Sequence, residues 1–242
     1  MGAIYHIARS HSTPESPKRA LSSPALGVPF MSGAIALEGL DLAALLCSRV
    51  CHDLISPVGA IMNGLEVMEE GKDEETNKFA MDLIKKSART ASAKLQFCRI
   101  AFGAAGSAGA QIDTGDAEKV TRGLMEDEKT KLAWNLPRVL LAKNRVKLLL
   151  NMMLLAAQAI PRGGQLTVDP VGSGDTIGFK VTSTGTNAKV PQSIPPLLAG
   201  GSAEHPVDAH AIQPFYTSLL AKNCGLSVGM AAEGDAVVVT AS

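Results

Sequence analysis

Residues 37–70 read LEGLDLAALLCSRVCHDLISPVGAIMNGLEVMEE, a segment with a regular apolar pattern. Its apolar residues recur every three or four positions, which is the spacing of one face of an α-helix. They are Leu42, Leu46, Val50, Leu54, Val58, Ile61, Leu65 and Met68. At the helical repeat, the stretch predicts a helix of about nine turns with one apolar stripe.

A second helix is predicted directly after the first. Gly71 stands where helices are commonly capped, and Asp73 opens a helical pattern that continues to Phe102. Two helices alone have too little core to be stable, so we expect this helical hairpin to pair with a second copy in a dimeric four-helix bundle. The core of that homodimer would contain Leu46, Val50 and Leu54.

The rest of the chain divides into an arm, a linker and a second domain. Residues 1–33, with prolines among Ser, Thr and Gly, are expected to form a flexible arm before the hairpin at 34–104. A glycine-rich run predicts a linker at 105–115. The domain at 116–242 predicts helices near 116–126, 144–160 and 208–222, and strands near 129–134, 165–169, 176–182, 226–230 and 236–240. The fold class is therefore α+β, with helices over one face of a mixed sheet.

Composition excludes several classes of function. Lys+Arg and Asp+Glu both number 23, and aromatic residues make up only 4%, so the sequence favours neither nucleic acid nor an anionic membrane as a partner. No stretch is uninterruptedly apolar for the length of a membrane span, and we expect a cytoplasmic protein. The cysteines form no CxxC pair; a metal site at Cys47, Cys51 and His52 is a weak alternative, because adjacent helical residues diverge by about 100°.

His52 is the candidate for chemistry. On a helical wheel it lies about 180° from the apolar stripe, so it is expected to face solvent and not the core. Imidazole suits phosphoryl relay, because its neutral nitrogen is nucleophilic near pH 7 and the phosphoramidate stays reactive. Asp53 is placed to orient or polarise the ring. An ordinary solvated histidine and an ordinary helix carboxylate are the alternatives.

The residues that share the outward sector with His52 predict a docking surface. A purely solvated face would rarely contain Ile55 and Met62, and Gly59 would let a partner's backbone approach closely. A helix contact within a dimer is the alternative use of this apolar patch. The polar residues of the same sector are Ser48, Asn63 and Glu66.

The run from Cys51 to Ile61 resembles the phosphoacceptor box of sensor histidine kinases, with His-Asp-Leu followed by Pro57 at the fifth position after His52. Ser56 belongs to this box. Together with Asn63-Gly64-Leu65-Glu66, the run is most similar to the histidine phosphotransferases of the alphaproteobacterial cell-cycle phosphorelay. The resemblance covers about residues 37–240, with hairpin, linker and second domain in the kinase order.

In that resemblance, the second domain takes the place of a kinase ATP-binding domain, but its nucleotide elements have been lost. Leu155 stands where the asparagine box would hold its metal-binding Asn. Ser183 replaces the Asp of the adenine box, and Asn187 replaces its second glycine. The helix from Pro214 to Leu220 lacks phosphate-cradling glycines. The resemblance thus implies a degenerate ATPase-like α/β sandwich that binds no cofactor.

The resemblance further implies a homodimer that takes a phosphoryl group from the receiver domain of a hybrid histidine kinase and delivers it to response regulator receiver domains. His52 would carry the group, and the receiver would supply the Mg²⁺. The docking residues would be Ser48, Ile55, Ser56, Gly59, Met62, Asn63 and Glu66. Three alternatives stay open at this point: an active sensor histidine kinase, a phosphatase that acts on receivers, and a non-catalytic dimeric helical adaptor.

Overall fold

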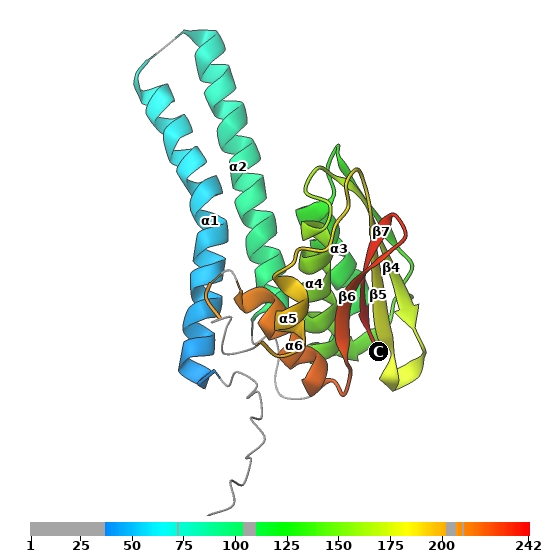
Figure 1. The fold of residues 1–242 in the computed structure, drawn as a ribbon. Coiled ribbons are helices and arrows are strands. Elements are labelled where there is room, and N and C mark those ends of the chain that lie inside the picture. Colours follow the sequence, from blue (N-terminus) through cyan, green and yellow to red (C-terminus); the bar gives the residue numbers. More distant parts are fainter. Residues whose placement is uncertain (1–36, 72, 104–109, 202–206, 210) are drawn as a thin grey trace, which may run out of the picture. The chain divides into compact units, whose positions relative to one another are not determined.

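The computed structural model describes residues 37–71, 73–103, 110–201, 207–209 and 211–242, so the predicted arm lies outside the described residues. The described residues belong to one compact unit, which contains both the hairpin and the sheet domain. Figure 1 shows a long helical hairpin followed by a sheet with helices on one side. The predicted α+β fold is confirmed.

The hairpin consists of α1 (Gly39–Glu69) and α2 (Glu74–Ala101), both within a few residues of the predicted bounds. Gly71 adopts a φ of 63°, the left-handed conformation that ends a helix without a Cβ clash. Asp73 caps α2, because its side chain accepts a hydrogen bond from the Thr76 N–H at 3.0 Å. This bond and a second from the Thr76 hydroxyl lower the pKa of the Asp73 carboxyl.

The two helices approach each other through small residues. A Cβ on Gly64 would lie 2.6 Å from a side-chain carbon of Ile84, so only glycine allows this spacing without a shift. On α2, the buried small residues Ala80, Ser87 and Ala91 continue the contact. Helix α2 does not cover the whole apolar stripe of α1, since Val58 and Leu65 of this stripe remain 49% and 42% exposed.

The C-terminal domain is a five-stranded sheet in the order β2-β4-β5-β7-β6. Only β2 and β4 are parallel, and the other neighbours are antiparallel. The strands are β2 (Thr130–Trp134), β4 (Gly164–Val171), β5 (Gly178–Thr184), β6 (Val228–Glu233) and β7 (Ala236–Ala241). The helices are α3 (Thr114–Met125), α4 (Lys143–Gln158), α5 (Ile194–Leu198) and α6 (Ile212–Asn223), with a short 3-10 turn at Gly174–Thr176.

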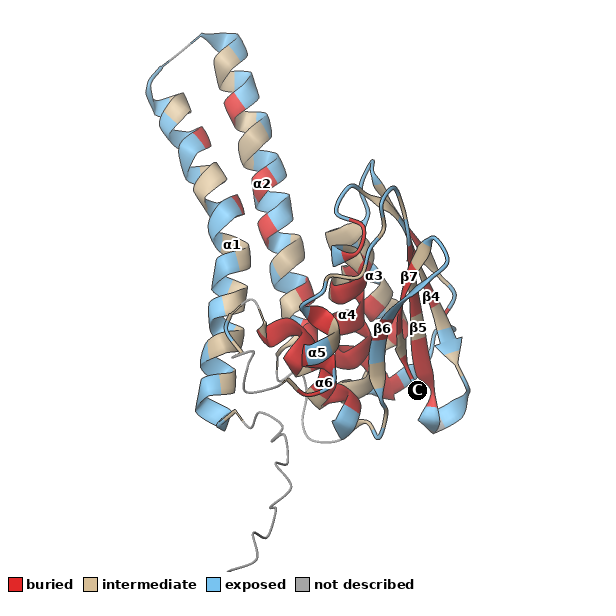
Figure 2. Cartoon of the chain, in the orientation of Figure 1, coloured by how far each residue is buried: buried red, intermediate tan, exposed pale blue. Residues whose placement is uncertain are grey.

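The core of this domain surrounds α4. This helix is buried almost all round, since it packs on α2, α3 and α6 as well as on β5 and β7. The inner face of the sheet meets it with Val168, Val181 and Val239, which are paired across β4, β5 and β7 and fully buried. Figure 2 shows the buried residues concentrated in α4, α6 and the strands, while most of the hairpin is exposed or intermediate.

A buried polar network joins the hairpin to α4. The amide of Asn151 donates to the carbonyl of Ala101 at the end of α2 (3.1 Å) and to that of Lys147 (2.8 Å). It also accepts from Gln213 Nε2 of α6 at 2.6 Å. Asn151 and Gln213 are 0% and 1% exposed, so these bonds form in a dry interior.

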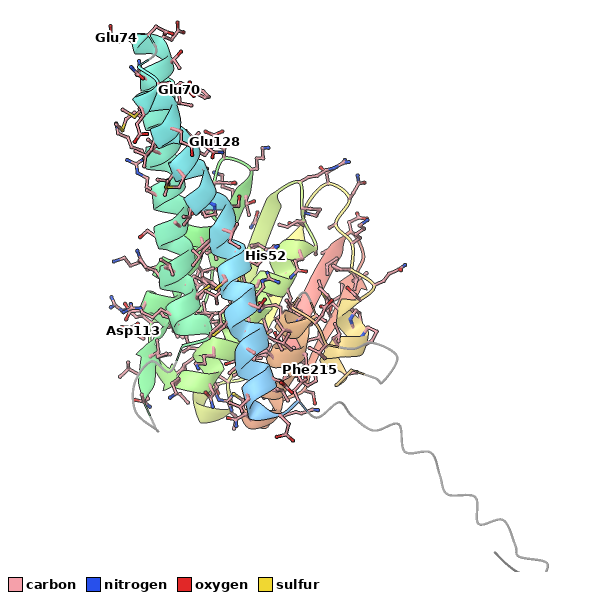
Figure 3. The ribbon with its side chains drawn as sticks, turned by 90° about the vertical axis from the view of Figure 1, so that its left-hand side faces the viewer. His52, Glu70, Glu74, Asp113, Glu128 and Phe215 are labelled. Atoms are coloured by element: carbon pink, nitrogen blue, oxygen red, sulfur yellow. The ribbon has the colours of Figure 1, made fainter. Side chains whose placement is uncertain are left out.

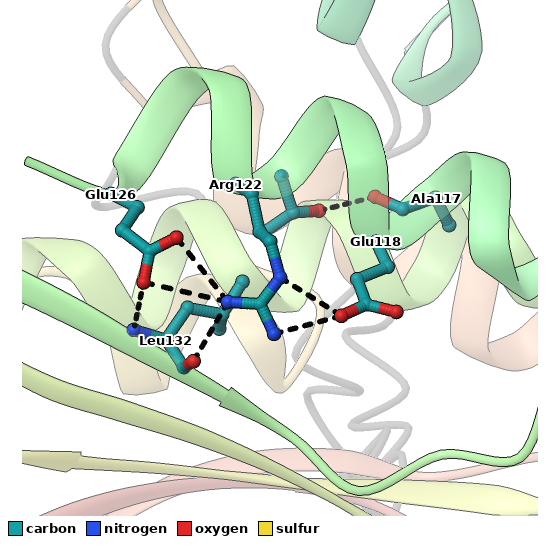
Figure 4. Close-up of polar contacts among 6 residues, drawn as sticks. Ala117, Glu118, Arg122, Glu126 and Leu132 are labelled. Atoms are coloured by element: carbon teal, nitrogen blue, oxygen red, sulfur yellow. Dashed lines mark hydrogen bonds and ion pairs between the residues drawn. The ribbon is translucent and has the colours of Figure 1, made fainter.

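Helix α3 is fastened to the sheet by Arg122. Its guanidinium donates to Glu118 (2.9 Å) and to the main-chain carbonyl of Leu132 in β2 (3.0 Å), as Figure 4 shows. Glu126 approaches the same guanidinium from the following turn, at 3.3 Å. The three side chains order the connection between α3 and β2.

Several short elements were not predicted. The predicted linker at 105–115 is too long, because β1 (Gln111–Asp113) pairs antiparallel with β3 (Leu140–Ala142) and α3 already starts at Thr114. A three-residue strand has no detectable period, so the pattern carried no signal for β1 or β3. Helix α6 starts at Ile212, four residues after the predicted start.

Helix α1 bears on the expectation that no stretch of the sequence is apolar over the length of a membrane span. Among the described residues it is the one helix long and apolar enough to cross a membrane by length and composition. Apolar residues on both the stripe and the outward sector produce this result. A single helix of this kind is weak evidence for a membrane span.

Candidate functional site: the His52 face of helix α1

His52 lies near the middle of α1 with its side chain 68% exposed (Figure 3). The wheel prediction of an outward histidine is therefore confirmed. The apolar stripe on the other side of the helix fixes this direction, since α2 packs against that side and buries Pro57 and Gly64. A nucleophile in this position is open to a macromolecular partner.

Asp53 stands beside the ring, and its carboxylate is held by a second residue. Its Oδ1 lies 3.6 Å from Nδ1 of His52, which is longer than a hydrogen bond but close enough for electrostatic attraction. Its Oδ2 accepts from Nε of Arg49 at 3.0 Å. The arginine thus fixes the carboxylate on the Nδ1 side of the ring.

Arg49 and Lys94, two residues that contact Asp53, were not predicted from the sequence. Arg49 precedes Asp53 by four residues, the spacing of an ion pair on a helix, so the pattern contained a usable signal. Lys94 of α2 donates to the main-chain carbonyl of Asp53 at 2.7 Å. Because this bond joins residues 41 positions apart, no local pattern could have revealed it.

The predicted docking residues occupy one exposed face. Ile55 is 70% exposed and Met62 is 52% exposed, unusual values for large apolar side chains. Gly59 is half-buried, and no described atom outside its own helical surroundings lies within 4 Å of the place a Cβ would take. The polar members of the face are all exposed: Ser48, Ser56, Asn63 and Glu66.

A cavity of about 320 Å³ opens beside Asp53, between the hairpin and the C-terminal domain. Charged atoms of Arg49, Asp53 and Lys94 line one part of it, and apolar side chains of α2, α3 and α4 line the rest. Cys98 also faces it. Burial, with a further contribution from the charge of Asp53, raises the pKa of the Cys98 thiol to about 11.

Of the three positions that the sequence resemblance aligns with kinase nucleotide boxes, Leu155 and Ser183 lie in the core and Asn187 is exposed. Leu155 is fully buried and offers no oxygen to a magnesium ion. The hydroxyl of Ser183 donates to the Ala156 carbonyl at 2.8 Å, so it is engaged within the fold. Asn187 has a φ of 60°, a left-handed conformation that suits the glycine it replaces.

The alternative of a metal site at the cysteines gains no support from the geometry. Within the described ranges, no group of three or more His, Cys, Asp or Glu side chains is placed to hold a metal ion. Cys47 and Cys51 are exposed free thiols on α1.

Comparisons with known proteins identify the family of the chain. The histidine phosphotransferase C-terminal domain family matches residues 114–236. "Protein phosphotransferase ChpT" of Brucella abortus (strain 2308) is 54% identical over 211 residues, which cover 87% of this chain and all of that protein.

A solved structure titled "1.7 Angstrom Structure of a Bacterial Phosphotransferase" matches with a TM-score of 0.79 and 51% identity, over 86% of this chain and 99% of that one. The Acinetobacter baumannii histidine kinase AdeS matches at 12% identity with a TM-score of 0.41, over 78% of this chain and 95% of that one, too distant to bear on the assignment. The identity across almost the full length of two phosphotransferases shows that the chain belongs to the histidine phosphotransferase family.

Proposed function

We propose that His52 accepts a phosphoryl group from the aspartyl phosphate of a hybrid-kinase receiver and passes it to the aspartates of response regulator receivers. One observation carries the proposal: the exposed His52 of the Asp/Pro box is bordered on its own helix face by exposed Ile55 and Met62. A nucleophile beside an apolar patch suits a partner that must present its reactive group at a fixed place.

The side chains around His52 assign the roles within this reaction. The carboxylate of Asp53 favours the tautomer with the proton on Nδ1, which leaves the lone pair of Nε2 as the nucleophile. That lone pair forms the N–P bond while the P–O bond to the receiver aspartate breaks, and the carboxylate leaves with the electron pair. The second transfer reverses these steps on another receiver. Mg²⁺ bound by the receiver neutralises charge on the phosphoryl oxygens in both steps.

The chain works without ATP in this proposal. Leu155 supports it, because its side chain has no oxygen for magnesium, and Ser183 supports it, because it lacks the carboxylate that a kinase presents to the adenine amino group and is fully buried. An active sensor histidine kinase is the competing reading. Isothermal titration with Mg²⁺-ATP separates the two: the phosphotransferase should give no binding heat, and micromolar, magnesium-dependent affinity would establish the kinase.

We also propose a homodimer in which two hairpins form a four-helix bundle in the cytoplasm. A groove between α1 and α2 supports this, because its lining is almost entirely apolar and includes Leu46, Val50 and Leu95. Val58, Leu65 and Phe79 add exposed apolar surface along the same hairpin. A second copy would bury all of it. The cell-cycle phosphorelay suggested by the sequence resemblance is the proposed setting.

A labelled receiver tests the proposal. A receiver domain phosphorylated with ³²P-acetyl phosphate is mixed with the chain, and label on the chain is followed by gel and by its stability to acid. Acid-labile, alkali-stable label that passes on to a second receiver supports the relay. A chain that never takes label would be an adaptor. Release of inorganic phosphate without onward transfer would identify a receiver phosphatase.

A further inference from the structure

Pro57 removes a hydrogen bond from the turn that carries His52. In an α-helix the N–H of each residue donates to the carbonyl four positions earlier, so residue 57 would donate to the carbonyl of Asp53. Proline has no N–H, and Pro57 lies inside α1, where it is buried. The carbonyl next to His52 therefore loses its regular main-chain donor.

Lys94 supplies a replacement from the other helix. Its Nζ donates to the Asp53 carbonyl at 2.7 Å, a short distance for a bond from an ammonium group to a neutral oxygen. Both residues are partly buried, and they line the cavity of about 320 Å³ together with Phe97 and Leu154. A hydrogen bond in such partly desolvated surroundings is stronger than one in open water.

Asp53 is consequently held at two points. Lys94 holds its main-chain oxygen and Arg49 holds its side chain, while His52 is the residue directly before it. Because the Lys94 bond crosses from α2 to α1, it also fixes the rotation of α2 relative to the His52 turn. Without that bond, the turn would have a free carbonyl and one less restraint.

We propose that Lys94 is a positioning residue, whose ammonium replaces the main-chain hydrogen bond that Pro57 removes and so fixes the backbone that directs His52. This inference rests on the proposed role of His52 as phosphoacceptor. The ring must meet the receiver's phosphorus in line with the leaving carboxylate, and a displacement of about 1 Å can cost on the order of a hundredfold in rate. Lys94 acts through Asp53 and need not touch the phosphoryl group.

The test uses Pro57 as a chemical rescue. Lys94→Met keeps an unbranched stem of similar length and removes the donor, whereas Pro57→Ala returns a main-chain N–H to the same carbonyl. The four proteins are wild type, each single variant and the double variant. Lys94→Arg retains a donor, and Lys86→Met is the matched control on an exposed part of α2.

Transfer is measured with a ³²P-phosphorylated receiver that labels the wild-type chain. At saturating receiver, Lys94→Met should lower the transfer rate constant on the order of tenfold or more, with the half-saturating receiver concentration unchanged. Lys94→Arg and the Lys94→Met/Pro57→Ala double variant should recover most of the loss, and Lys86→Met should match wild type. Amide hydrogen exchange over residues 50–57 should quicken in Lys94→Met and slow again in the double variant.

Two results would overturn the inference. One is a Lys94→Met protein that transfers as fast as wild type. The other is a double variant as slow as Lys94→Met while Lys94→Arg stays active, since the charge of Lys94 and not its bond to Asp53 would then matter. Hydrogen exchange does not depend on phosphate chemistry. If His52→Gln retained label while the exchange pattern followed the prediction, the proposed function would fail and the Lys94 bond would stand.

Discussion

Replacing Asn151 by Leu would test how the hairpin is joined to the C-terminal domain. Leucine has nearly the shape of asparagine, so the change removes hydrogen bonds and leaves little cavity. The carbonyl of Ala101 and Nε2 of Gln213 would each lose the Asn151 side chain as partner while staying buried. The carbonyl of Lys147 keeps its regular donor in the helix.

The expected loss of stability follows from these two buried groups, which have lost their hydrogen-bond partner. A buried polar group left without a partner costs about 1–3 kcal/mol, so Asn151→Leu should lower the free energy of unfolding by about 2–6 kcal/mol. Gln213→Leu should lower the free energy of unfolding by less. It leaves only the side-chain oxygen of Asn151 without a partner, and it removes Gln213 Oε1, which has no hydrogen-bond partner among the described residues. In the double variant only the main-chain carbonyl of Ala101 lacks its partner. The double variant should therefore be more stable than Asn151→Leu by about 1–3 kcal/mol.

Urea denaturation at one fixed protein concentration measures all four proteins, with circular dichroism for the helices and Trp134 fluorescence for the sheet. Rescue of Asn151→Leu by a second core substitution is an unusual outcome, and only a shared buried network explains it. A double variant no more stable than Asn151→Leu would show that Gln213 and Asn151 do not form one network, because Gln213 would then gain nothing from Asn151.

Three further predictions concern the hairpin. Met62→Lys should change stability and dimerisation by no more than about 0.5 kcal/mol but should slow phosphotransfer at subsaturating receiver. If both Met62→Lys and Ile55→Lys transfer at the wild-type rate under these conditions, the docking surface lies elsewhere. Leu46→Ala should cost about 2–5 kcal/mol of dimer stability, and light scattering that reports a wild-type monomer at micromolar concentration would contradict the dimer. At pH 8 the Cys98 thiol should stay protonated and resist iodoacetamide until the protein is unfolded in urea, because burial raises its pKa to about 11; mass spectrometry that finds Cys98 labelled as fast in the folded protein as in the unfolded one would oppose this.

Long elements with a strong period could be predicted from the sequence. The stripe that ends at Met68 determined the bounds of α1 and the outward direction of His52, since both depend on the helical repeat alone. The alternation of apolar residues predicted the five strands of the sheet in the same way. Three-residue strands such as β1 fell below the length at which a period can be recognised.

The immediate surroundings of His52 could be predicted only in part. Exposure of Ile55 and Met62 followed from their wheel positions, as did the neighbouring Asp53. Lys94 reaches the site because two helices pack side by side, and the relative rotation of two helices depends on contacts such as Gly64 against Ile84. Such long-range pairings leave no trace in local spacing.

In the proposed function, His52 carries the phosphoryl group between receivers. The direct measurement follows ³²P from a phosphorylated receiver onto wild type, His52→Gln and the control His210→Gln, and then onto a second, unlabelled receiver. Wild type and His210→Gln should take acid-labile label and pass it on, whereas His52→Gln should fold and dimerise but take none. Label retained on folded His52→Gln, or lost from His210→Gln, would contradict the account.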